Sequence, residues 1–263
     1  MTPSPQHDEV LDNVVWHALT GPQARFVVRP RREPPVALRF DPEVALFGAV
    51  EGAADRAGWH ALAQLLAVGE SCAFFRPEVE SPPDGWAQQF RGPCFQMVAD
   101  ALPDRRAFDR VELGPADAAD MLALVQRTEP GPFFARTHEL GRYIGVRRGG
   151  RLVAMAGERL RAPGFVEVSA VCTHPDVRGE GLGAALTLEI AHAIRERGDE
   201  AFLHVLQTNE SALRLYRKLG FRVRRSVDVV AAQWLDDGLP CDAQRESAPP
   251  TAVRYIPDRS GSR

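Results

Sequence analysis

The sequence predicts a mixed α/β fold in which helices flank a central sheet. In the C-terminal half, short β-rich runs alternate with helical stretches that carry one apolar face. The runs 142–147 and 151–160 flank Arg148-Gly149-Gly150, and the two glycines accept the positive φ of a tight turn, which predicts an antiparallel hairpin. A third strand, 165–173, leads through a glycine-rich turn into a helix.

The remaining elements of this half follow from the same patterns. A short strand ends near Leu113, and Pro115 and Asp117 open a helix that runs through Val125. The later elements are a helix over 182–197 followed by Gly198, a strand over 201–206, a helix over 211–219 ended by Gly220, and a β stretch over 221–234.

The N-terminal half is predicted to be folded and β-rich. It shows β runs at 25–29, 36–40, 44–50, 72–76 and 95–99, with an amphipathic helix over 53–68. A charged segment with Pro103 suggests a boundary within 101–110. We therefore expect residues 1–107 to form an accessory domain or a degenerate copy of the next domain, 108–235, and residues 236–263 to form a mobile tail.

Composition limits the classes of function. The net charge of −3 gives no general attraction to nucleic acid or to an anionic membrane, so neither is expected as a partner. Cys72, Cys94, Cys172 and Cys241 form no C-x-x-C pair and have no histidine at metal-ligand spacing, so no metal is expected. With no export signal and no long apolar run, we expect a cytoplasmic protein, and heavy use of Ala, Gly, Pro and Arg suggests a bacterial one.

The glycine-rich turn is the most informative segment. Gly179, Gly181 and Gly183 let the backbone come close to a ligand, while the start of a helix adds exposed N–H groups and partial positive charge. Arg178 could add a charged donor. The pattern indicates a pyrophosphate site, although glycines before a helix often only make a turn.

A dinucleotide-binding fingerprint is the rival interpretation, because the turn also fits Gly179-x-Gly181-x-x-Ala184. That fingerprint needs an acidic residue at the end of the next strand. Gln207 and Thr208 stand there instead, and the turn follows a hairpin. The context argues against a nicotinamide or flavin oxidoreductase.

Two motifs in order resemble the GNAT superfamily of N-acetyltransferases: Arg178-x-x-Gly181-x-Gly183, then Asn209-x-x-Ala212-x-x-Leu215-Tyr216-x-x-x-Gly220-Phe221. The resemblance covers about residues 108–234 and implies a largely antiparallel sheet and acetyl-CoA as co-substrate. It implies that the pantetheine arm lies along Val171, Cys172 and Thr173, and that the pyrophosphate lies on the amides of Gly179, Glu180, Gly181, Leu182, Gly183 and Ala184. Asn209 would contact the cofactor, cap the second helix, or do both.

The resemblance implies direct transfer of the acetyl group to an amine within a ternary complex, assisted by a base. Glu167 interrupts an apolar strand, and its position six residues before Thr173 matches the base of the histone-type branch. It could instead face solvent or pair with an arginine. His204, where other branches place a glutamate, is either a base or a buried, satisfied histidine.

Tyr216 matches the tyrosine that many family members place beside the thioester sulfur as general acid. A phenol can protonate a thiolate only slightly uphill, and the alternative is a core position on the helix. A backbone N–H of Cys172 or Thr173 would stabilise the oxyanion. Cys172 itself is not expected to be a nucleophile, since the family generally transfers directly.

The acceptor is weakly specified. The loop 130–139, with Phe133, Phe134, Arg136 and His138, falls where the family binds its acceptor, although the two phenylalanines could simply pack. The acceptor is expected to be a small-molecule or peptide amine; its identity, the acyl chain length and a homodimer stay open. The alternative from another class is a module that binds acyl-CoA without turnover. The arginines at 29, 31 and 32 fit a solvated turn better than an anion site.

Overall fold

The computed structural model describes residues 9–28, 35–105 and 107–235. Most of its strands form one sheet in the order β3-β10-β4-β9-β8-β7-β6-β5, in which only β8 and β9 run parallel. The largely antiparallel mixed α/β fold is therefore confirmed. The strands of this sheet are β3 (Ser71–Arg76), β4 (Trp86–Ala99), β5 (Val111–Leu113), β6 (Tyr143–Arg148), β7 (Arg151–Ala162), β8 (Phe165–Thr173), β9 (Glu200–Leu206) and β10 (Phe221–Trp234).

The C-terminal half follows the predicted elements closely. Gly149 (φ 56°) and Gly150 (φ 81°) turn the chain between β6 and β7, as their sequence suggests. The helices are α4 (Ala118–Thr128), which follows a 3-10 turn η3 (Pro115–Asp117), α5 (Leu182–Glu196) and α6 (Glu210–Lys218). Gly198 follows α5 with φ 86°, the left-handed conformation of a glycine beyond a helix end.

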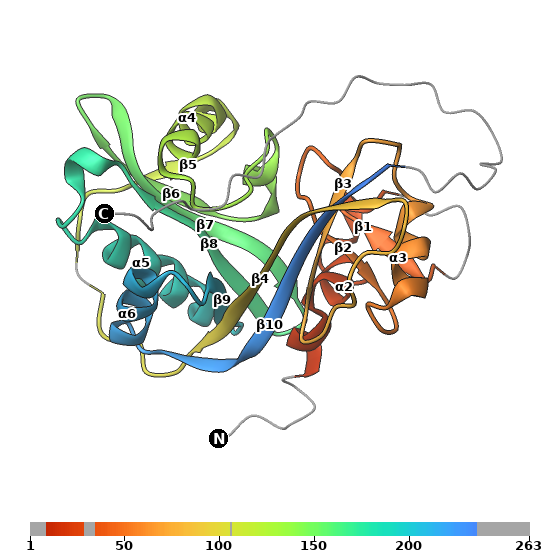
Figure 1. The fold of residues 1–263 in the computed structure, drawn as a ribbon. Helices are drawn as coiled ribbons and strands as arrows, with labels where there is room; N and C mark the ends of the chain where they lie inside the picture. Colours follow the sequence, from red (N-terminus) through yellow and green to blue (C-terminus); the bar gives the residue numbers. More distant parts are fainter. Residues whose placement is uncertain (1–8, 29–34, 106, 236–263) are drawn as a thin grey trace.

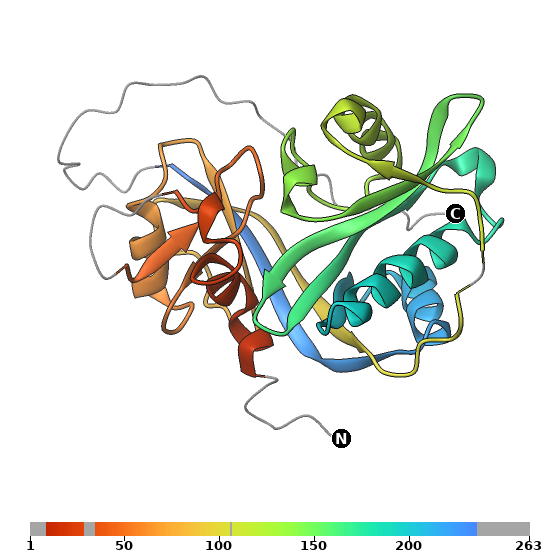
Figure 2. The ribbon, with the colours of Figure 1, turned by 180° about the vertical axis from the view of Figure 1, so that it is seen from behind.

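Helices cover both faces of the sheet (Figures 1 and 2). On one face, α5 and α6 pack on β6 to β9 through a cluster that includes Leu186, Ile190 and Leu213. On the other face, α4 buries Met121 and Leu124 against β6 and β7. Part of this second face is covered by N-terminal elements, whose cluster joins Phe40 and Phe47 to Phe165 and Phe202 of the sheet.

The N-terminal residues are part of the same sheet, which differs from the expected division at residue 107. Strand β4 lies between β9 and β10, and β3 pairs with the other edge of β10. In Figure 1 the long strands β4 and β10 run together from the N-terminal elements to the C-terminal helices. The segment 101–110 is therefore a connection within one sheet, because strands from before residue 107 are hydrogen-bonded to strands from after it.

The N-terminal elements differ in detail from the prediction. A short helix α2 (Val14–Leu19) after η1 (Glu9–Asn13) was not expected, and the 25–29 run forms a 3-10 turn, η2 (Ala24–Phe26), with one bridge from Val27. Of the 44–50 run, β2 (Gly48–Val50) pairs with β1 (Ala37–Arg39) and Phe47 makes an isolated bridge to Ala73, whereas Val44 and Ala45 turn back onto Asp41. Helix α3 (Arg56–Ala63) is shorter than predicted, and η4 (Thr137–Leu140) and η5 (Pro175–Val177) complete the elements.

Some expectations fall on residues outside the described ranges. These are the mobile tail at 236–263, Cys241, and the arginines at 29, 31 and 32. In the described part of the chain, no helix has both the length and the apolar character needed to cross a membrane.

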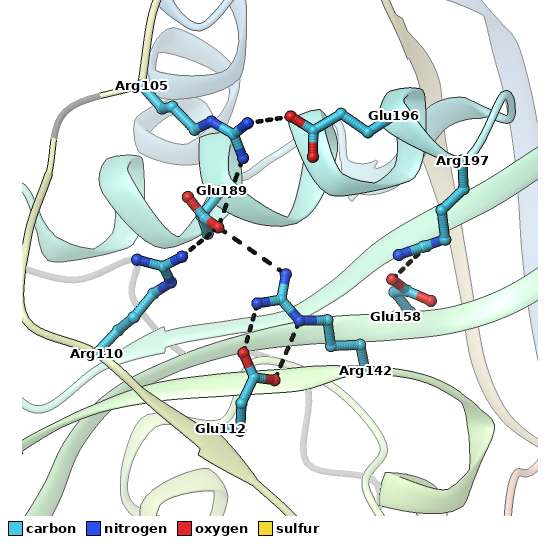
Figure 3. Close-up of polar contacts among 8 residues, drawn as sticks. All are labelled: Arg105, Arg110, Glu112, Arg142, Glu158, Glu189, Glu196 and Arg197. Carbon is cyan, nitrogen blue, oxygen red and sulfur yellow. Dashed lines mark hydrogen bonds and ion pairs between the residues drawn. The ribbon is translucent and has the colours of Figure 1, made fainter.

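An ion network fastens the connection 101–110 to α5 (Figure 3). The Glu189 carboxylate lies 2.7 Å from Arg110 Nη2, 3.6 Å from Arg105 Nη1 and 4.0 Å from Arg142 Nη1. Its side chain is 6% exposed, so solvent screens these pairs less than surface pairs. Arg105 also pairs with Glu196, which lies about two helical turns further along α5.

Candidate active site

The site begins where β8 and β9 separate. The two strands pair only at Phe165 to Glu167, opposite Glu200 to Phe202, although both continue beyond that point. Beyond the last pair, β8 bonds only to β7 and β9 only to β4. The facing edges of both strands therefore keep unpaired backbone groups, which is where an extended ligand can add its own hydrogen bonds.

A bulge marks the point of separation. Ala170 has φ 52°, and the register of β8 on β7 shifts between the pairs Gly157–Ser169 and Met155–Cys172. A left-handed conformation in a residue other than glycine is uncommon within a strand and redirects the chain. The bulge turns Val171, Cys172 and Thr173 away from β9.

The glycine-rich turn lies at the end of the diverging strand. Gly179 (φ 89°) and Gly181 (φ 80°) both adopt the left-handed conformation, and α5 begins directly after Gly181. The first helical hydrogen bond of α5 runs from Ala185 N–H to Gly181 O. Within the described residues, no acceptor is found for the N–H groups of 179–184, and free N–H groups at a helix start are groups to which an anion can bind.

The turn comes close to the open strand. A Cβ atom placed on Gly183 would lie 3.4 Å from Thr173 Oγ1 and 3.7 Å from Val171 Cγ1, whereas Gly179 and Gly181 face open space. Arg178 is exposed, with Nε 3.4 Å from Thr173 O, and Glu180 lies 3.9 Å from Arg148. The predicted strand and turn residues are thus brought together.

Helix α6 supplies the opposite side. Asn209 caps it, since its Oδ1 accepts a hydrogen bond from Ala212 N at 3.1 Å, so the predicted capping role is present. Tyr216 is half-buried, edge-on to Phe221. Burial, with a further contribution from Cys172, raises the pKa of Tyr216 to about 12. Tyr216 and Val171, which belongs to the diverging part of β8, pack against the same apolar cluster.

Glu167 lies deep in the sheet and is fully buried. Its carboxylate accepts two hydrogen bonds from Arg159, at 2.8 and 2.6 Å, and one from Leu160 N at 3.3 Å. Burial alone would raise the pKa of Glu167, but the charge and hydrogen bonds of Arg159, and then the hydrogen bond of His204, lower it to about 2. The structure thus shows the arginine pairing that was the alternative to a general base, and such a pairing makes a carboxylate a weaker base.

His204 continues the buried chain of polar groups. Its Nδ1 lies 2.7 Å from Glu167 Oε1, and its Nε2 lies 3.1 Å from Gln96 Nε2. Gln96 Oε1 accepts from Arg224, so the Gln96 amide nitrogen is the donor to His204 and the imidazole donates through Nδ1. With a side chain only 3% exposed and both nitrogens engaged, His204 matches the buried, satisfied histidine.

A small pocket lies beside the bulge at Ala170. It is lined by Ser169 and Ala170 of β8, by Tyr143 and Arg159, and by the loop 130–133 with Thr137. Phe133 is buried and packs edge-on against Tyr143 at 5.8 Å. The predicted acceptor loop thus borders the bulge, and Phe133 packs and lines the pocket at once.

N-terminal residues hold this loop in place. Arg136 pairs with Asp41 at 2.8 Å and its N–H bonds to Glu43 O, while Thr137 Oγ1 donates to Val44 O at 2.7 Å. Phe134 and His138 are both half-buried, and neither lines the pocket. The N-terminal half therefore shapes the acceptor end indirectly, through the backbone of the loop.

Comparisons with known proteins place this architecture. Residues 143–230 match the family described as FR47-like protein. A solved structure of a putative acetyltransferase from the GNAT family of Novosphingobium aromaticivorans is 38% identical, with a TM-score of 0.77, over 85% of this chain and 98% of that one. The chain belongs to the GNAT family of acetyltransferases.

Curated relatives match shorter stretches of this GNAT chain. A mycothiol acetyltransferase of Thermomonospora curvata is 42% identical over 84 residues, which are 32% of this chain and 28% of that protein. The N-alpha-acetyltransferase RimI of Mycobacterium tuberculosis is 39% identical over 101 residues, which are 36% of this chain and 63% of that protein. The matches span less than two thirds of either relative.

Sequence reasoning missed two residues of the GNAT chain's pocket, Arg159 and Tyr143. Arg159 stands on β7, eight positions before Glu167, and the hairpin between β7 and β8 brings the two together. Tyr143 starts β6, where its hydroxyl is buried without a partner in the described structure. A charged residue within the apolar part of the 151–160 run was the available signal for Arg159.

Proposed function

We propose that this GNAT protein transfers the acetyl group of acetyl-CoA directly to an amine. The observation that carries the proposal is the separation of β8 from β9 beside the open glycine turn of α5. An unpaired strand edge, a bulge and a set of free N–H groups follow one another along residues 168–184. This order suits a long ligand with an amide-containing arm and a phosphate end.

The residues present fit acetyl-CoA. The N–H groups of 179–184 would hold the pyrophosphate, and Gly179 and Gly181 leave the space beside them free. The unpaired groups of Val171, Cys172 and Thr173 would hold the pantetheine amides. The bound thioester would supply the activated acetyl group, and the N–H of Cys172 or Thr173 is our candidate for stabilising the oxyanion.

Tyr216 is our candidate for the proton donor to the leaving thiolate. It packs from α6 against the same apolar cluster as Val171 of the open strand, and its raised pKa keeps the phenol protonated over the working range of pH. Glu167 is assigned a different task, which is to hold the Arg159 guanidinium at the pocket. The acceptor amine then gives up its proton to water rather than to this carboxylate.

The reaction setting is inferred more coarsely. We expect a small-molecule or peptide amine as acceptor and a reducing, cytoplasmic compartment. Three cysteines, Cys72, Cys94 and Cys172, are free in the described part of the chain, which supports a reducing setting.

Calorimetric titration with acetyl-CoA tests the proposal, with NAD as the control ligand. Binding of acetyl-CoA alone, followed by release of free thiol when an amine library is added, is the expected result. Binding without thiol release would favour a sensor of acyl-CoA. Absence of binding would overturn the proposal.

Tyr216→Phe separates turnover from binding. Losing a general acid costs on the order of 100-fold in kcat, whereas the Kd for acetyl-CoA should change little because the ring still packs on Phe221. An unchanged kcat would assign Tyr216 to core packing only.

A further inference from the structure

The pocket at the bulge contains a buried polar atom that the fold itself does not use. Tyr143 is 1% exposed, and its hydroxyl has no hydrogen-bond partner within the described residues. A buried hydroxyl left unpaired costs stability, so such a group usually serves something outside the fold. Tyr143 is one of the residues that line the pocket, so a ligand oxygen in the pocket is our candidate for the missing partner.

A second group in the pocket is also partly unused. Arg159 gives Nε and Nη2 to Glu167, while its Nη1 makes no hydrogen bond among the described residues. The guanidinium is fixed by that two-point contact and lies over the rings of Phe47, at 4.9 Å, and Phe75, at 5.6 Å. Its side chain is only 11% exposed, and this rigid placement suits recognition better than a flexible surface arginine would.

The charge of the pocket points the same way. Glu167 neutralises Arg159, and the described residues that line the pocket include no carboxylate that could attract an ammonium group. Arginine has only hydrogen-bond donors, and a phenol donates readily. The two groups together therefore favour a ligand oxygen that accepts hydrogen bonds. Ser169, half-buried on the bulge, adds a further hydroxyl.

We propose that the acceptor carries a carbonyl or carboxylate oxygen next to its amine, and that Tyr143 and Arg159 bind this oxygen. The inference rests on the proposed acetyl transfer and specifies its substrate class: α-amino amides, amino acids or peptide N-termini rather than simple alkyl amines. The pocket borders the bulge, so an oxygen held there places the neighbouring amine close to the open part of β8.

Thiol release from acetyl-CoA with three amines tests the proposal: L-alaninamide, L-alanine and isopropylamine. Tyr143→Phe removes one hydrogen bond and keeps the ring against Phe133. We expect KM for alaninamide or alanine to rise about fivefold, with a smaller change for isopropylamine. Comparing variant with wild type on the same amine removes the effect of differing amine basicity. The amide and the acid distinguish a carbonyl from a carboxylate.

A second variant and a control complete the design. Arg159→Lys keeps the charge but loses the two-point contact with Glu167. It should raise the KM for alaninamide, relative to the KM for isopropylamine, by about tenfold. Thr20→Val removes an exposed hydroxyl on the N-terminal half and should change the KM for neither amine. Since the Tyr143 hydroxyl is unpaired, Tyr143→Phe should leave the Tm unchanged or raise it, so a change in KM does not reflect unfolding.

Two outcomes contradict the proposal in different ways. Equal changes for alaninamide and isopropylamine in both variants would show that the pocket does not recognise an acceptor oxygen, while acetyl transfer itself stands. No thiol release with any amine would overturn the proposed function, and the acceptor assignment with it.

Discussion

The buried carboxylate of Glu167 shows how far a single residue can be interpreted from its neighbours in the chain. The sequence places a charge inside an apolar strand, and both a base and an arginine pair fit that pattern. The choice depends on Arg159, which only the register of β7 on β8 brings within 2.6 Å. Local patterns indicate that a buried charge needs a partner, but they do not give the partner.

The pair makes stability depend on acid. The pKa of Glu167 is lowered to about 2 in the folded protein, below its value in an unfolded chain. Its contribution is therefore complete above about pH 5 and is lost as the pH falls toward 2, by on the order of 3 kcal/mol. In urea unfolding experiments, the free energy of unfolding of the wild type should fall steeply as the pH is lowered from 5 to 2.

Glu167→Gln provides the comparison for that experiment. The variant should be less stable at pH 7, because Arg159 then stays buried without a counter-charge, and its stability should fall less between pH 5 and pH 2. Parallel curves for the two proteins would mean that another carboxylate sets the acid limit.

At the scale of elements, the glycine turn and α5 act as one device, because the helix starts where the free N–H groups converge. Gly181→Asp would put a side chain at φ 80° and bring a negative charge to the expected pyrophosphate. We expect the Kd for acetyl-CoA to rise by at least about 100-fold, equivalent to about 2.7 kcal/mol, in calorimetry.

Gly198→Asp is the matched control for backbone strain. Gly198 also has a positive φ, 86°, with open space around it, but it lies at the other end of α5. It should lower stability by a similar amount and leave the affinity intact. Equal losses of affinity in both variants would remove the turn as the binding site.

The ion network on α5 is expected to stabilise the fold mainly through Glu189. Glu189→Gln leaves Arg105, Arg110 and Arg142 around an uncharged, mostly buried side chain (Figure 3). Because the arginines are partly exposed and screened, we expect a loss of about 2 kcal/mol in the free energy of unfolding. Glu196 is exposed and, among the described residues, pairs with Arg105 only, so Glu196→Gln should lose under about 0.5 kcal/mol. The reverse order would contradict a central role for Glu189.

At the scale of the whole molecule, the sequence predicts some regions far better than others. Elements after residue 108 were predicted within a few residues, because glycine turns, caps and amphipathic helices are local signals. The insertion of β4 between β9 and β10 has no local signal, since strand partners far apart in sequence are chosen by packing. The pocket was missed for the same reason.

The shared sheet predicts the behaviour of fragments. A chain that starts at residue 108 lacks β4, so β9 and β10 each lose the neighbour that joins them. We expect this fragment not to unfold cooperatively in circular dichroism, and adding residues 1–107 as a separate chain should restore structure at least partly. Cooperative unfolding of the fragment alone would restore the idea of two independent domains.

The position of β4 also bears on how the chain is made. Synthesis produces β3 and β4 well before β10, their common partner, which is complete only after residue 234 has been added. Until then, the β3 and β4 edges that pair with β10 stay unpaired, and apolar side chains stay exposed. This condition favours aggregation and chaperone binding. The architecture that joins the two halves into one sheet therefore delays completion of the sheet until β10 has been translated.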